Sequence, residues 1–186
     1  MQYELTTPCT AADLAPLKAG DTVLLSGVVY TARDQAHKRM LEALDKGEKL
    51  PFDLEGSAIY YVGPTPERPG EVIGSAGPTT SGRMDAMSPR LLDLGNKIMI
   101  GKGKRDADVK EAVVRNGAVY LAALGGAGAL MAQSVKTLEV IAWPDLGCEA
   151  VRRLTVEDMP LTVILDAHGG DLYLSGPEAY REAQVK

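Results

Sequence analysis

The feature of this chain that most limits its fold is an alternation between runs of branched apolar residues and segments with helical spacing. The run DTVLLSGVVYTARD, residues 21–34, predicts a buried strand. Residues 36–46 follow with apolar side chains at helical spacing, and Gly47 predicts the end of that helix. Because the alternation continues along most of the chain, the sequence predicts an α/β domain with a mixed sheet covered by helices.

The same reasoning predicts the remaining elements. Helices are expected from Thr80 or Ser81 to Leu94, with others at residues 108–115, 125–133 and 175–184, the last of them capped. A tight turn is expected at 168–171. No repeat or linker interrupts the chain, so residues 1–186 are predicted to form a single domain. Strands are expected at residues 57–63, 72–73, 117–124, 135–143, 152–159 and 160–167, and residues 97–106 are expected to form a strand that runs into a Gly- and Lys-containing loop.

Composition and charge exclude several classes of protein. An apolar content of 45% with 24% charged residues is typical of a soluble globular domain. The net charge of -5 argues against a nucleic-acid binder, which would carry a basic stripe. The first residues lack the basic and apolar regions of a signal peptide, and no apolar run is long enough to span a membrane. The expected location is therefore the cytoplasm, with neither nucleic acid nor membrane as a partner.

The chain has two cysteines, Cys9 and Cys148, which lie far apart in sequence. Their spacing matches neither a disulfide framework nor a local zinc or cluster site. Any metal is therefore expected to be held elsewhere. A nucleophile elbow, a histidine pair and a Cys–His couple are also missing from the sequence.

Residues 74–90, GSAGPTTSGRMDAMSPR, combine a turn, several hydroxyls and an arginine in a short space. The chain is expected to turn at residues 77–78 and to open a helix at Thr80 or Ser81. Hydroxyls, free backbone N–H groups and Arg83 would then surround a small anion such as a carboxylate or phosphate. The alternative is that a hydroxyl only caps the helix and Arg83 is a solvated charge.

Charged side chains also stand at other expected strand ends, where α/β sheets bind ligands. Arg33 is followed by Asp34 and His37, and Lys102 lies between two glycines. Each has a plainer interpretation as well. Arg33 and Asp34 would form a weak surface ion pair, His37 would be structural, and Lys102 would belong to a basic loop.

The glycine-rich segments do not match nucleotide-binding motifs. The loop around Lys102 lacks the spacing of a Walker A motif. In GGAGAL, which begins at Gly125, the dinucleotide pattern fails because Met131 takes the place of the third glycine. Close packing of a helix against a strand explains these glycines instead. Thr79 would need a neighbouring charge or a metal-bound species to do chemistry, so the chain looks like half of an active site.

Four segments carry a resemblance to a known family. In order and spacing they resemble the iron–sulfur hydro-lyases of the class I fumarase and tartrate dehydratase family. The similar part is the C-terminal domain, which is a separate β subunit in two-component members. The resemblance covers residues from about 3 to 175, and GPTTSGRMD and TARDQAHKR are its most specific parts. The segments are SGVVYTARDQAHKRM at 26–40 and those at 60–105, 118–135 and 144–173.

The resemblance implies a swivelling β/β/α-type domain with an active site at the interface to an α subunit. That subunit would hold a four-iron, four-sulfur cluster, whose open iron would bind substrate as a Lewis acid. Fixed cations suit a dicarboxylate, because they stabilise the charge that develops as a proton moves beside a carboxylate. By the same resemblance Thr79 is the catalytic acid/base residue, Arg33, Arg83, Lys102 and Thr80 bind substrate, and Asp34 and His37 support them.

The expected function is the β subunit of a fumarate hydratase, which with its α subunit converts fumarate reversibly to (S)-malate. The β subunit of L(+)-tartrate dehydratase or of mesaconate hydratase is the alternative, since these substrates also carry two carboxylates. A non-catalytic anion-binding or scaffold domain is a third possibility. The isolated chain is expected to fold without activity, and the assembly to be αβ or α2β2. Cys148, Arg152 and the HGGD turn depart from the family pattern outside the expected site.

Overall fold

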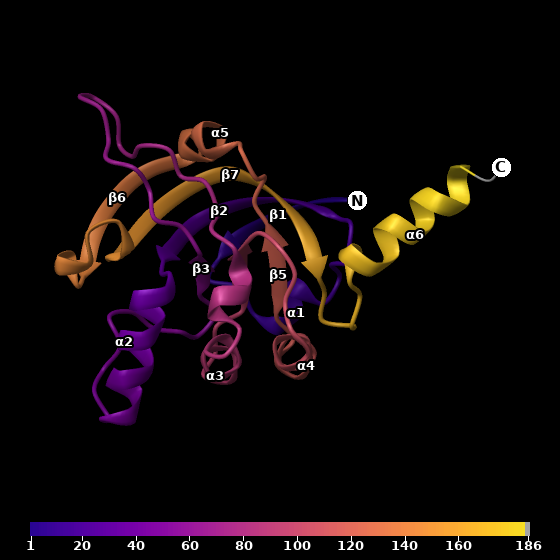
Figure 1. Ribbon diagram of the computed structural model, residues 1–186, viewed down its shortest axis with the longest axis horizontal. Helices are drawn as coiled ribbons and strands as arrows, with labels where there is room; N and C mark the ends of the chain where they lie inside the picture. The colour runs from indigo at the N-terminus through magenta and orange to yellow at the C-terminus, as the bar shows by residue number, and fades with distance from the viewer. Residues whose placement is uncertain (185–186) are drawn as a thin grey trace.

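The computed structural model describes residues 1–184, which contain a mixed seven-stranded sheet and helices on its faces. Figure 1 shows β2, β6 and β7 as long curved strands, with α2, α3 and α4 on one side of them. The strands are β1 (Gln2–Thr7), β2 (Thr22–Thr31), β3 (Ala58–Tyr60), β4 (Ile98–Gly101), β5 (Val119–Ala122), β6 (Val135–Ala142) and β7 (Val151–Leu165). The α-helices are α1 (Ala11–Leu14), α2 (Asp34–Asp45), α3 (Ser88–Asp93), α4 (Ala107–Asn116), α5 (Gly128–Gln133) and α6 (Leu172–Gln184), and the 3₁₀ helices are η1 (Ser81–Met84) and η2 (Pro144–Glu149).

The sheet closes on itself. β2 pairs in parallel with β1 and β3 along one edge and antiparallel with β7 along the other. β3, β4 and β5 continue in parallel, and β5 then pairs antiparallel with the end of β7. The pairings β2–β3–β4–β5–β7–β2 therefore form a ring, which β1 and β6 extend at two places.

Two hydrophobic clusters lie on opposite faces of this ring. Side chains of a strand alternate between its faces, and along β3 Ala58 and Tyr60 belong to one cluster while Ile59 belongs to the other. The first cluster fills the inside of the ring. The second is covered by residues of α2, α3 and α4, which lie together in Figure 1. The mixed sheet and its helical cover confirm the predicted α/β class.

Several predicted elements differ from the structure. Val72 and Ile73 form no strand in the described residues, because the glycines on either side of them lead into an irregular loop. The helix expected from Thr80 to Leu94 is divided into η1 and α3, and Pro89 in the first turn of α3 favours this new start. α6 begins at Leu172, before the predicted capped segment at 175–184. In its first turn the N–H of Tyr173 donates to the carboxylate of Asp171.

The strands expected at 152–159 and 160–167 are one strand, β7, which continues through Pro160. Its pairing with β6 ends at Val156 and its pairing with β5 begins at Thr162. Between these points one edge of β7 carries no ladder, and proline is tolerated at such an edge. The prediction missed β1, although Tyr3 and Leu5 alternate with polar residues as an edge strand would.

Among the helices of residues 1–184, none combines the length and apolar content needed to cross a bilayer. The longest helix, α6, projects from the end of β7 and away from the sheet (Figure 1).

Candidate active site

The carboxyl ends of four parallel strands bring most of the predicted site residues to one edge of the sheet. β2, β3, β4 and β5 run in the same direction, so their following loops lie side by side. Arg33 follows β2, and Lys102 follows β4 directly. The loop that begins at Gly125 follows β5, and a Cβ at Gly125 would lie 3.9 Å from Cδ of Lys102. This is the edge at which open α/β sheets place ligands.

The segment with the two threonines is fastened to the same edge. The N–H of Thr79 donates to the carbonyl of Tyr61 at 2.8 Å, just beyond β3. Thr80 forms a parallel bridge with Lys102, and the next N–H, of Ser81, donates to the Lys102 carbonyl at 2.8 Å. Thr79 and Thr80 therefore lie between the ends of β3 and β4, with the side chain of Thr79 partly buried and that of Thr80 exposed.

The hydroxyls of Thr79 and Thr80 are not used within the described part of the fold. Thr80 precedes η1 but makes no side-chain capping bond. Within residues 1–184 neither Thr79 nor Thr80 has a side-chain hydrogen bond, so both hydroxyls are available to a ligand. Because η1 is a single turn of four residues, a helix dipole contributes little to anion binding here. An anion at this place would be held by side chains and loop amides.

Hydrogen bonds of the buried Ser81 side chain hold this segment against β4 and β5. Its hydroxyl accepts the N–H of Lys102 at 3.0 Å and contacts the Tyr120 hydroxyl at 2.9 Å. Tyr120 in turn donates to the carbonyl of Gly103 at 2.9 Å, so Ser81 must be the donor between the two hydroxyls. A Cβ at Gly101 would lie 2.0 Å from Ser81 Oγ, which explains the glycine. Burial raises the pKa of Tyr120, which keeps this chain of bonds neutral.

A buried arginine holds the loop after β4 against the segment before α3. The Arg105 side chain is fully buried, and its Nε donates to Asp85 at 2.6 Å and its Nη2 to Ser88 at 2.9 Å. Its guanidinium also stacks near the rings of Tyr61 and Tyr120, at 5.4 and 5.1 Å from their centroids. Because it is surrounded by partners, Arg105 is a structural residue beneath the candidate site.

Arg33 is held more loosely. Its Nη2 lies 3.5 Å from carboxylate oxygens of both Asp34 and Glu149, and its side chain is 19% exposed. The Nε of Arg33 and Oδ2 of Asp34 are buried without a hydrogen-bond partner in the described residues. The ion pair expected as the plainer interpretation is therefore present. It nevertheless leaves donors of the guanidinium for a ligand.

His37 lies under Arg33 and is completely buried. Its Nδ1 contacts the Arg33 carbonyl at 3.0 Å, and its ring meets that of Tyr61 edge to face at 5.3 Å. Burial, together with the positive charge of Arg105, lowers the pKa of His37 to about 4. The imidazole is therefore neutral near pH 7, with Nδ1 protonated and Nε2 unpartnered among the described residues. This position supports the backbone of Arg33 and favours the structural interpretation.

Arg83 and Lys102 are exposed, and within residues 1–184 their charged groups have no ion-pair partner. Lys102 lies directly beside Thr80. Arg83 lies on η1, three residues farther along, and no contact in the described chain joins it to Arg33 or Lys102. The structure therefore groups Lys102 with the threonines and leaves Arg83 at the rim.

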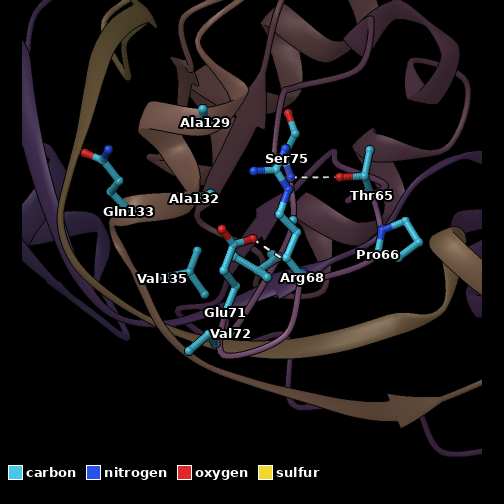
Figure 2. Close-up of a pocket in the computed structure, with 12 residues that line it drawn as sticks. Thr65, Pro66, Arg68, Glu71, Val72, Ser75, Ala129, Ala132, Gln133 and Val135 are labelled. Atoms are coloured by element: carbon cyan, nitrogen blue, oxygen red, sulfur yellow. Dashed lines mark hydrogen bonds between the residues drawn. The ribbon is translucent and has the colours of Figure 1, made fainter.

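Two hollows of the surface lie against the loop that follows β3. One of about 460 Å³ lies between the loop at residues 65–75 and α5, and Figure 2 shows Arg68, Glu71 and Gln133 around it. A second, of about 450 Å³, lies on the other side of the same loop, next to Cys148. Neither is lined by Thr79, Arg33 or Lys102. The candidate site therefore lies outside both hollows, at the edge of the sheet.

The chain's own residues do not fit an iron–sulfur cluster, which is held by several thiolates. Cys9 is buried, and its N–H donates to Gly56 before the start of β3, away from the candidate site. Cys148 is exposed in η2. In the described residues no three His, Cys, Asp or Glu side chains are grouped to hold a metal ion.

Comparison with known protein families identifies the domain to which this chain belongs. A profile of the family described as "Fumarase C-terminus" matches residues 1–176. The chain belongs to the Fumarase C-terminus family. This confirms the resemblance found in the sequence.

Relatives of this Fumarase C-terminus domain include proteins of two kinds. The putative L(+)-tartrate dehydratase subunit beta of Methanocaldococcus jannaschii is 43% identical, covering 88% of this chain and 87% of the relative. The L(+)-tartrate dehydratase subunit beta of Escherichia coli is 32% identical, covering 98% and 92%. The aerobic class I fumarate hydratase of Escherichia coli is 38% identical over 87% of this chain, but the chain spans only 30% of that relative's length.

Residues that support the site of this Fumarase C-terminus domain were missed in the sequence. Arg105 stands in the charged run KGKRD, which looked like a solvated loop, and Asp85 and Ser88 showed no signal that they would face it. Ser81 was expected only as a cap. Glu149, which pairs with Arg33, comes from a distant turn whose position depends on the folded sheet.

Proposed function

We propose that this chain is the β subunit of an iron–sulfur fumarate hydratase. In this proposal it acts in the cytoplasm with an α subunit, and that subunit holds the four-iron, four-sulfur cluster. The observation that carries the proposal is the pair of available hydroxyls, Thr79 and Thr80, fixed beside Lys102 at the strand edge that also presents Arg33. The chain supplies the substrate-binding half of the site, and the open edge faces the partner.

The chemistry suits this arrangement. Hydration of fumarate adds a hydroxyl to one carbon and a proton to its neighbour, and both carbons carry carboxylates. Negative charge develops on a carboxylate when the proton beside it moves, and fixed cations stabilise that charge. Arg33, Lys102 and Arg83 are proposed to bind the two carboxylates, with Thr80 donating a further hydrogen bond. Thr79 is proposed to transfer the proton, aided by the nearby ammonium of Lys102.

L(+)-tartrate dehydration is the second candidate. It is favoured by the two beta-subunit relatives, because this chain covers 87% and 92% of their lengths. The same cations would bind tartrate, which also has two carboxylates. Mesaconate hydration remains a third reaction of the same chemistry.

A direct assay distinguishes these reactions. The chain is produced with its α subunit under anaerobic conditions, and the complex is tested side by side with fumarate, L(+)-tartrate and mesaconate. Fastest turnover of fumarate supports the proposal, and turnover of tartrate alone replaces it with the second candidate. If the two chains form no complex and no substrate turns over, the non-catalytic anion-binding or scaffold domain is favoured. The isolated chain is expected to be folded and inactive.

Replacement of Thr79 tests the proposed proton transfer. In the complex, Thr79→Ala should lower kcat by about 10² to 10⁴, the usual contribution of a general acid or base, without affecting assembly. Thr79→Ser keeps a hydroxyl at this place and should retain most of the activity. Steady-state kinetics and size-exclusion chromatography measure the two effects. Turnover by Thr79→Ala at the wild-type rate would remove this residue from the mechanism.

A further inference from the structure

Arg33 lies between two parts of the chain that are distant in sequence. A Cβ at Gly63 would be 2.9 Å from Arg33 Nη1 and 3.2 Å from its Cδ, so this glycine lets the side chain lie against the backbone. On another side Glu149, the last residue of η2, places Oε1 3.5 Å from Arg33 Nη2. The carbonyl of Cys148 also lies 3.3 Å from the same Cβ position. The guanidinium is therefore enclosed by the loop after β3 and by η2.

Glu149 binds at two points of the junction between β2 and α2. While Oε1 faces Arg33, Oε2 accepts the backbone N–H of Gln35 at 2.9 Å. The first amides of a helix have no acceptor within the helix, so this bond caps α2. Asp34 also lies 3.5 Å from Arg33, but it belongs to α2 itself. Glu149 is thus the carboxylate that ties Arg33 to a separate element.

The turn that carries Glu149 is fastened on both sides. Arg39 of α2 donates to both carboxylate oxygens of Asp145, the Nη1 bond being 2.9 Å. The Thr31 hydroxyl at the end of β2 donates to the Ala150 carbonyl at 3.3 Å. The Arg152 guanidinium donates at 2.8 to 3.0 Å to three carbonyls of the turn, those of Gly147, Cys148 and Ala150. Because of these bonds the carboxylate of Glu149 has a fixed place from which to hold Arg33.

We infer that Glu149 is a positioning residue, which holds the Arg33 guanidinium in the orientation that receives a substrate carboxylate. The inference rests on the proposed function, because that function makes Arg33 a ligand of a dicarboxylate. Glu149 itself does not touch the substrate. A long side chain that is ordered before binding loses less conformational freedom on binding. The effect of Glu149 therefore falls on KM more than on kcat.

The test uses the anaerobically purified complex with its α subunit. Glu149→Ala should raise KM for the dicarboxylate about three- to tenfold, which corresponds to ordering one long side chain, and leave kcat within about twofold. Glu149→Gln keeps an oxygen for the Gln35 N–H but removes the charge, so it should raise KM while leaving the unfolding temperature unchanged. Glu139→Ala is the matched control, since Glu139 is an exposed carboxylate on β6 with no ion pair in the described chain.

A double-mutant cycle decides whether Glu149 acts through Arg33. In an Arg33→Ala background, Glu149→Ala should cause no further rise in KM. The inference is wrong if both Glu149 variants keep the wild-type KM, or if their effects multiply with that of Arg33→Ala. If Arg33→Ala impairs an active complex and the Glu149 variants do not, only the role of Glu149 fails. A wild-type complex without activity on any of the dicarboxylates would overturn the proposed function and this inference together.

Discussion

Two arginines of this chain, Arg105 and Arg33, have very different surroundings. Arg105 is fully buried, with side-chain bonds to Asp85 and Ser88 and an aromatic ring on each side. Arg33 is partly exposed, its two carboxylate partners lie at 3.5 Å, and its Nε–H has no partner in the described residues.

The difference separates a structural group from a group that is proposed to bind substrate. A buried donor left unpaired costs free energy, on the order of 1 to 3 kcal/mol, and Arg105 avoids this cost completely. Arg33 bears it at its buried Nε, and the 19% exposure of its side chain agrees with the proposal that the guanidinium binds a substrate carboxylate. The contrast gives a working rule for this edge of the sheet. Arg105, whose donors all have partners, maintains the loops, and Arg33, which keeps an unpaired donor, is the one proposed to bind substrate.

The largest expected effect is on Arg105. Arg105→Met should destabilise the chain by about 3 to 5 kcal/mol, because it leaves the carboxylate of Asp85 buried without its partner. Arg33→Met should cost less than about 1 kcal/mol, since its ion pairs are long and partly solvated. Urea unfolding of the isolated chain measures both. Equal losses of stability would mean that both arginines have a structural role.

His37, which contacts the Arg33 carbonyl and is influenced by the charge of Arg105, provides the next effect, a dependence of stability on pH. Burial lowers its pKa from 6.5 in the unfolded chain to about 4. The unfolded chain therefore takes up a proton first as the pH falls, and stability is lost between about pH 6.5 and pH 4. At the lower end the loss reaches about 3 kcal/mol.

Urea unfolding at several pH values tests this dependence. His37→Gln should remove this part of the slope, whereas the same replacement of His168, which is exposed, should leave it in place. An unchanged slope in His37→Gln would show that the imidazole is not buried as a neutral group beside Arg33.

The smallest effect is a difference in alkylation between the two thiols. It compares the packed interior, which contains Cys9, with the surface near Arg33, which carries Cys148. Burial raises the pKa of Cys9 to about 11, and its side chain is inaccessible. Cys148, next to Glu149, is exposed. Iodoacetamide at pH 8 should therefore modify the native chain once, at Cys148, as measured by intact mass and peptide mapping. Cys148→Ser should stay unmodified, and labelling of Cys9 in the folded chain would contradict this packing.

Local patterns in the sequence predicted much of the fold. Helical spacing and branched runs gave the alternating elements, because these periodicities come from the geometry of each element alone. The closing of the sheet by β7 was not predicted, since it depends on pairing between residues near opposite ends of the chain. Pro160 also disguised β7 as two strands. Its position at an open edge is a fact of tertiary structure.

The sequence indicated some of the candidate site residues and missed others. Arg33 and Lys102 stand at strand ends, and parallel strands bring such ends together whatever the details of packing. Thr79 reaches the same edge through the bond from its N–H to the Tyr61 carbonyl. The residues that support them were not predicted, because their positions depend on the tertiary structure. Glu149 reaches Arg33 only through the shape of the η2 turn, and Arg105 turns inward from a run that looks solvated. The roles proposed for Thr79 and the cations stay predictions until the complex is assayed.

The ring of strands has a consequence for how the chain is made. Thr22 at the start of β2 is paired with Thr162 near the end of β7, and β5 completes its own pairing on the same last strand. A chain emerging from the ribosome can form α2 and pair β2 with β3 early. It cannot close the ring until β7 has been synthesised. Contacts between such distant residues slow folding. The strand edge of β2 is therefore exposed for most of synthesis, and that of β5 from its own synthesis until β7 emerges. The nascent chain is most open to aggregation in that interval.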